Sequence, residues 1–330
     1  MSVERTDLPS GLTVVTEAMA GARSASFGCW VRVGARDEAA DLAGASHFLE
    51  HLLFKGTETR SGREISEAIE AVGGELNAHT SHEHTAFYAR VPASAAAVGL
   101  ELLTDVVTSP AFDEDDVESE RQVILEELHL AEDEGDDRVL SLAHEVLWPD
   151  HPLGREVLGS FETIDALERD AIAAFFERHY HPSNLVLVAA GDVDHDAVVA
   201  AGERFPSRRA GERPVREAPG ATPGGRSHAL LRRPSEQAHL CFAARFAPTI
   251  RSLRARGGQP GLRRRPVEPP VPGDPRGAWA GVLGVLLGLG LLRRRLAGGL
   301  RRHRCGARRR RAQGRARPSR RARLRGRDRA

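Results

Sequence analysis

The character of the chain changes sharply near residue 249, and this change limits which part of it can form a folded core. Residues 1–248 carry 22 basic residues against 43 acidic ones, whereas residues 249–330 carry 25 arginines against three acidic residues. The last segment has arginine triplets and Gly-Pro turns but no regular apolar period, which predicts an irregular or disordered basic tail. We therefore expect the fold in the first three quarters of the chain.

The apolar pattern of that first part predicts an α+β domain over residues 1–215. Strand patterns occupy residues 12–17, 24–33, 75–81, 84–91 and 184–190. Helical periods occupy residues 44–54, 61–72, 94–109, 114–133, 137–147 and 164–180. The expected architecture is a mainly antiparallel sheet with packed helices. Residues 216–248 are predicted to form a linker and the start of a second unit, with a strand within 228–245.

Cysteine usage and the lengths of apolar runs indicate the compartment. Cys29, Cys241 and Cys305 are too scattered for a disulfide framework or a cysteine-based zinc site. Residues 1–10 lack the apolar core of a signal peptide. The longest apolar run, residues 279–292, is too short to cross a bilayer comfortably. The expected location is the cytoplasm, with no membrane partner.

Residues 47–51 read His-Phe-Leu-Glu-His, an H-x-x-E-H pattern. On a helix, His47 and His51 share one face because they are four residues apart. Two neutral imidazoles at this spacing can bind one metal ion, and Glu50 can reach a water molecule beside it. By itself the pattern is equally compatible with a polar helix face. A catalytic zinc site also needs a third protein ligand.

Residues 120–127 read Glu-Arg-Gln-Val-Ile-Leu-Glu-Glu. Glu120 and Glu127 are seven residues apart, which is about two helical turns, so they face the same way. Together with the H-x-x-E-H helix, this E-R-x-V-I-x-x-E helix resembles the pitrilysin/insulinase family of zinc peptidases, in the branch of the processing peptidases. The resemblance implies Zn²⁺ held by His47, His51 and Glu127, with Glu120 steadying a ligand histidine. If the register slips, Glu126 is the alternative ligand.

The segment between these two helices extends the resemblance. Residues 73–81 read Gly-Gly-Glu-Leu-Asn-Ala-His-Thr-Ser, like a family stretch that forms an edge strand and binds substrate by backbone pairing. By this resemblance Asn77 and Ala78 lie beside the scissile bond. The expected activity is a zinc metalloendopeptidase acting on peptides or unfolded protein segments, with Glu50 as the base that activates the zinc-bound water.

The resemblance covers residues 3–245 and stops there. The family continues into a second domain that contributes an Arg and a Tyr, and no such segment follows Arg245. We hypothesise a shifted reading frame, since GC-rich codons for residues 271–285 read one base later can encode a family-like Arg-Gly-Leu-Ala-Tyr-Ser segment. Sequencing the gene around residues 246–252 tests that hypothesis. The competing interpretation is a basic tail that binds nucleic acid, which the lack of interleaved aromatic residues argues against.

Loss of a second domain leaves an alternative function open. The chain could be a catalytically weak zinc-binding or peptide-binding partner subunit, since family enzymes work as pairs of two-domain halves. The expected partners are a peptide substrate and a homo- or heterodimer partner. The intact H-x-x-E-H favours the active kind, and the missing Arg and Tyr favour the inactive kind.

Overall fold

The structure is a computed structural model, and it describes residues 2–206, 215–216, 227–234 and 237–243. All of the described residues belong to one unit of the chain. The predicted tail, with its reading-frame hypothesis, lies outside the described residues. The described part of 228–245 contains no strand, contrary to expectation.

A six-stranded sheet runs in the order β1-β2-β6-β3-β5-β4. Only β2 and β6 pair in parallel, and the other four pairs are antiparallel, so the predicted mainly antiparallel sheet is confirmed. The bounds are β1 Ser2–Asp7, β2 Thr13–Ala18, β3 Ser24–Val31, β4 Glu75–Thr80, β5 Thr85–Pro92 and β6 Leu185–Gly191. The sequence did not predict β1, because this edge strand is largely exposed and has no apolar alternation.

Eight α-helices accompany the sheet in the described residues: α1 Ala45–Leu52, α2 Gly62–Ala71, α3 Ala96–Thr108, α4 Glu114–Asp133, α5 Gly135–Leu147, α6 Phe161–Ala166, α7 Arg169–His179 and α8 His195–Gly202. The helix predicted over 164–180 is two helices, because the chain turns to an extended conformation at Leu167. The Ser61 N-cap and its capping box with Glu64 are present at α2.

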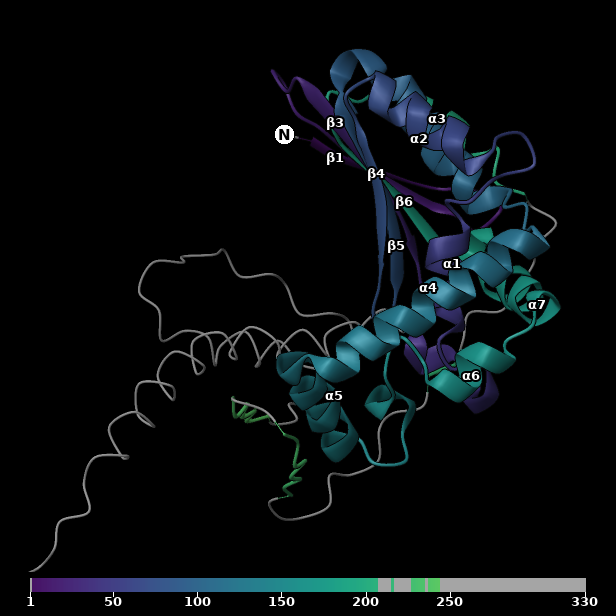
Figure 1. Ribbon diagram of the computed structural model, residues 1–330. Helices are drawn as coiled ribbons and strands as arrows, with labels where there is room; N and C mark the ends of the chain where they lie inside the picture. Colours follow the sequence, from purple (N-terminus) through teal and green to yellow (C-terminus); the bar gives the residue numbers. More distant parts are fainter. Residues whose placement is uncertain (1, 207–214, 217–226, 235–236, 244–330) are drawn as a thin grey trace, which may run out of the picture. The chain divides into compact units, whose positions relative to one another are not determined.

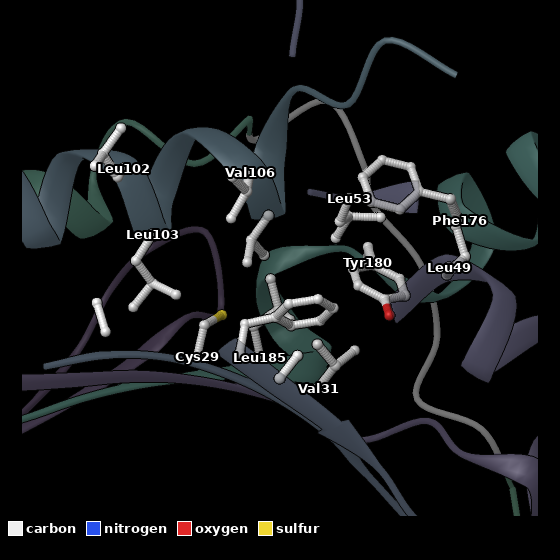
Figure 2. Packing of buried hydrophobic residues seen from close by; sticks show 14 of the residues in the cluster. Cys29, Val31, Leu49, Leu53, Leu102, Leu103, Val106, Phe176, Tyr180 and Leu185 are labelled. Atoms are coloured by element: carbon white, nitrogen blue, oxygen red, sulfur yellow. The ribbon is translucent and has the colours of Figure 1, made fainter. Parts of the chain in front are cut away.

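The core lies between one face of the sheet and the helices, which gather on one side of it (Figure 1). Residues along β3 and β6 alternate in burial, so one face of each strand is buried. Figure 2 shows Cys29 and Val31 of β3 below Leu103 of α3 and Tyr180. The thiol of Cys29 is completely buried, and this burial raises its pKa to about 12, so it behaves as an apolar core group.

Strand β4 forms one edge of the sheet, and helix α1 packs against it. Among the described residues, β4 pairs only with β5. Helix α4 packs in turn on α1, and Figure 1 shows these two helices beside the lower part of the sheet. The histidine helix therefore lies between an edge strand and the glutamate helix. No helix within the described ranges combines the length and apolarity that a membrane crossing requires.

Candidate metal centre

The start of α1 is held by a buried carboxylate and a glycine. Glu38 accepts hydrogen bonds from the backbone N–H of Gly44 at 2.8 Å and of Ser46 at 2.8 Å. A carboxylate at a helix N-terminus is favourable because unpaired N–H groups point at it. Burial raises the pKa of Glu38, and the two N–H donors act in the opposite direction.

Gly44 itself has φ of 95°, a left-handed conformation that favours glycine. A side chain at this position would meet Ile164 Cδ1 at 2.6 Å and the Leu158 carbonyl oxygen at 2.7 Å. The close approach brings the start of α1 against the loop before α6. The direction of the histidine helix is thus determined by Glu38 and Gly44 together.

Arg121 fixes α4, the helix that carries both candidate glutamates. Its guanidinium donates to the Ile164 carbonyl and, at 2.8 Å, to the Leu167 carbonyl. It also lies over the ring of Phe48 on α1, 5.7 Å from the centroid. Arg121 therefore joins α4, α1 and the end of α6. The carbonyls released where the predicted long helix breaks at Leu167 are the groups that it binds.

Three predicted ligands come together between α1 and α4. Glu127 Oε2 lies 3.6 Å from His47 Nε2 and 3.6 Å from His51 Nε2. One donor atom from each of the three residues lies within 4.8 Å of the other two. Tetrahedral zinc with bonds of about 2.1 Å needs ligand atoms about 3.4 Å apart, so the donor types and spacing fit this ion.

The two histidines have different surroundings. Burial, followed by the charge of neighbouring His51, lowers the pKa of His47 to about 4, so this imidazole is neutral at pH 7. His51 Nδ1 lies 2.9 Å from Glu120 Oε2. Donation from Nδ1–H to this carboxylate leaves the lone pair on Nε2, the atom that faces Glu127. Glu120 is only 3% exposed.

The remaining predicted residues lie on the same two helices and on β4, outside the three-residue cluster. Glu50 is partly exposed on α1, one residue before His51. Asn77 is exposed and Ala78 is buried on β4, and the Ala78 N–H donates to Asn77 Oδ1 at 2.8 Å. Glu126 is exposed on α4 and lies outside the cluster, which includes Glu127.

Sequence reasoning missed three residues that build this site: Glu38, Lys55 and Arg121. Lys55 Nζ lies 2.6 Å from Glu120 Oε1. Arg121 is part of the quoted glutamate motif and Lys55 follows the histidine motif, so both were visible as pattern members. Their partners are 43 and 65 positions away in sequence, at Ile164 and Glu120, and no local period relates them.

Comparison with known proteins gives the same family that the motifs suggested. A sequence profile described as Insulinase (Peptidase family M16) matches residues 13–160. A second profile, described as the Peptidase M16 inactive domain, matches residues 166–300. The similarity to this second profile thus extends past residue 249, and the predicted domain boundaries remain predictions.

Similar proteins agree with the two profiles. An uncharacterized zinc protease of Mycobacterium leprae is 46% identical over 245 residues, which are 73% of this chain and 55% of that protein. An uncharacterized zinc protease of Streptomyces coelicolor is 42% identical over 308 residues, covering 89% of this chain and 60% of the relative.

The chain thus spans little more than half the length of these relatives. The fold agrees with the crystal structure of a protease from Helicobacter pylori, with a TM-score of 0.61 and 24% identity over 66% of this chain and 53% of that one. With two matching profiles and the H-x-x-E-H and glutamate helices in contact, the chain belongs to the insulinase family, peptidase family M16.

Proposed function

We propose that this chain is a zinc-dependent metalloendopeptidase that hydrolyses peptides or unfolded protein segments. The observation that carries the proposal is the convergence of His47, His51 and Glu127 on one point, from two helices separated by more than 60 residues. Two imidazoles and one carboxylate are a ligand set of catalytic zinc sites, which keep a further position open. The low pKa of His47 favours the neutral form that a metal ion requires.

In this proposal His47, His51 and Glu127 hold the zinc ion. Bound zinc supplies a Lewis acid that polarises the scissile carbonyl and makes water more acidic. Glu50 would accept a proton from the attacking water as the new C–O bond forms, and would then deliver it to the amine nitrogen as the C–N bond breaks. Glu120 keeps the His51 ring oriented through its 2.9 Å contact.

Strand β4 is the proposed substrate edge. It lies at the end of the sheet beside α1, and an extended peptide can pair with the free backbone groups of such an edge. Asn77 and Ala78 are proposed to lie beside the scissile bond. Backbone pairing selects for extended conformation rather than for side chains, which suits an enzyme acting on unfolded segments.

The test uses Glu50→Gln, which keeps the size of the side chain and removes its basic oxygen. We expect the full-length variant to keep the zinc content of the wild type and to hydrolyse an unstructured peptide at least about 100-fold more slowly. Glu126→Gln is the matched control, because it removes an exposed carboxylate next to Glu127. Retained hydrolysis in Glu50→Gln would show that this carboxylate is not the base.

The alternative is a catalytically weak zinc-binding or peptide-binding partner subunit, and it rests on the sequence, in which no tyrosine and no Arg-Gly-Leu-Ala-Tyr-Ser-like segment follows Arg245. The wild-type protein separates the two functions when zinc content and peptide cleavage are measured with and without a chelator. Zinc with chelator-sensitive cleavage supports the enzyme. Zinc without cleavage supports the partner subunit, in which case a second chain is the proposed source of the missing activity.

A further inference from the structure

Lysine use in this chain is extreme. The 330 residues include 46 arginines and one lysine, Lys55. A composition so biased toward arginine would supply an arginine wherever any cation sufficed. Its one lysine lies directly beside the candidate metal centre, which indicates that this position requires an ammonium group.

Lys55 continues the line of the two histidines. His47, His51 and Lys55 are spaced by four residues, the interval that places side chains on one helix face. Helix α1 ends at Leu52, and the Lys55 N–H donates to the Leu52 carbonyl at 3.0 Å. This turn extends the helix end, so Lys55 follows on the face that carries His47 and His51. Its Nζ lies 2.6 Å from Glu120 Oε1.

Glu120 therefore has two partners on its two oxygens. Oε1 meets the Lys55 ammonium at 2.6 Å, and Oε2 meets His51 Nδ1 at 2.9 Å. The Glu120 side chain is 4% exposed, whereas that of Lys55 is 42% exposed. A buried carboxylate is stable as an anion only when its charge is compensated. Lys55 supplies this compensation from the solvent side without competing for the oxygen that His51 uses.

The chemistry of the cation decides whether Oε2 of Glu120 stays available to His51. An ammonium donates from a single point and contacts one carboxylate oxygen, whereas a guanidinium fork tends to take both oxygens at once. A fork on Glu120 would compete with His51 for Oε2. This difference explains why a lysine stands here in a chain that otherwise uses arginine.

We propose that Lys55 is a positioning residue for the metal centre, acting through Glu120 on His51. It holds Glu120 Oε1 so that Oε2 is directed at His51 Nδ1, and this contact presents Nε2 of His51 to the metal ion. The inference rests on the proposed zinc site and adds a second residue, beside Glu120, to the support of His51. It gives Lys55 no contact with substrate or with the reacting atoms.

The experiment is a double-mutant cycle on zinc affinity, measured on the full chain by competition with a chelating dye. We expect Lys55→Met to weaken zinc binding by about 10-fold and Glu120→Gln by about 10- to 100-fold, the range for residues that support metal ligands. In the Glu120→Gln background, Lys55→Met should change the affinity by less than about twofold, because the two residues act through one contact.

Two further variants keep the test decisive. Arg63→Met removes an exposed cation from α2, 85% exposed, and should leave zinc affinity within about twofold of the wild type. Lys55→Arg preserves the charge and should bind zinc more tightly than Lys55→Met but more weakly than the wild type, because the fork also draws on Oε2. It provides the comparison if Lys55→Met does not fold.

The results separate this proposal from the proposed function. A wild-type chain that binds no zinc overturns the metal centre itself. A wild-type chain that binds zinc while Lys55→Met binds it equally well overturns only the role of Lys55. The role is also overturned if Lys55→Met weakens zinc binding by the same factor with and without Glu120, or if Lys55→Arg binds as weakly as Lys55→Met.

Discussion

Replacing Gly44 by alanine tests how the start of the histidine helix is built. Gly44 has φ of 95°, and a methyl group there would lie 2.6 Å from Ile164 Cδ1 and 2.7 Å from the Leu158 carbonyl oxygen. Gly73, which follows α2, has φ of 69° and no atom within 4 Å of the same methyl position. The two glycines share left-handed backbone but differ in crowding, so Gly73→Ala is a matched control.

The expected costs follow from that difference. A non-glycine residue in the left-handed region costs about 1 kcal/mol at either site. At Gly44 the methyl group must also displace a backbone carbonyl, and overpacking of this kind adds about 1–3 kcal/mol. We therefore expect a loss of about 3 kcal/mol in the free energy of unfolding for Gly44→Ala and about 1 kcal/mol for Gly73→Ala.

Urea unfolding followed by circular dichroism measures both losses, and zinc affinity measures the functional consequence. Gly44→Ala should weaken zinc binding, because moving the start of α1 displaces His47 and His51 relative to Glu127 on α4. Gly73→Ala should leave zinc affinity unchanged. If the two variants lose the same stability, crowding at the start of α1 contributes nothing and the reasoning is refuted.

Three other measurements probe contacts between distant segments. Arg121→Met should lower the unfolding free energy by about 3–4 kcal/mol, because it removes charged donors from the carbonyls of Ile164 and Leu167; a loss below about 1 kcal/mol in urea unfolding would contradict this. Arg216→Met should cost about 3 kcal/mol by the same assay, since it leaves the Asp37 carboxylate, 2% exposed, without the two guanidinium contacts at 2.8 and 2.6 Å. Burial, and then the charge of His144, lowers the pKa of His82 from 6.5 to about 4, so the unfolded chain binds the proton more tightly. His82 therefore leaves the free energy of unfolding unaffected above about pH 6.5 and lowers it progressively as the pH falls from 6.5 toward 4. Urea midpoints should fall over this pH range, and they should fall less steeply in His82→Gln.

Much of the candidate site could be predicted because its signals are local. The spacing of His47 and His51 places them on one helix face whatever surrounds them, and Ser61 with Glu64 marks the start of α2 without any tertiary contact. The ligand set including Glu127 came from the family resemblance, and the structure brings the three residues together. The roles of Glu50, Asn77 and Ala78 remain proposals. The shifted reading frame in residues 249–330 remains a hypothesis.

Where local signals were weak or misleading, tertiary contacts gave a different result. Strand β1 has no apolar alternation, yet it pairs along β2 from Ser2 to Asp7. The apolar period across residues 164–180 continued through Leu167, but the helix ends there and Arg121 donates a hydrogen bond to the buried Leu167 carbonyl. Contacts with another segment outweighed local preference in both cases: backbone hydrogen bonds with β2 at β1, and side-chain hydrogen bonds from Arg121 at Leu167.

The sequence by itself determined the residue types of the metal centre and their order along two helices, because helix geometry converts a spacing of four or seven into a shared face. It could not determine how far apart those helices lie. That distance depends on Gly44 packing against the loop before α6, and on Arg121 joining α4 to Phe48. The pairing of Lys55 with Glu120 also arises only when the two helices pack, because a contact across 65 residues has no period that a sequence pattern can express.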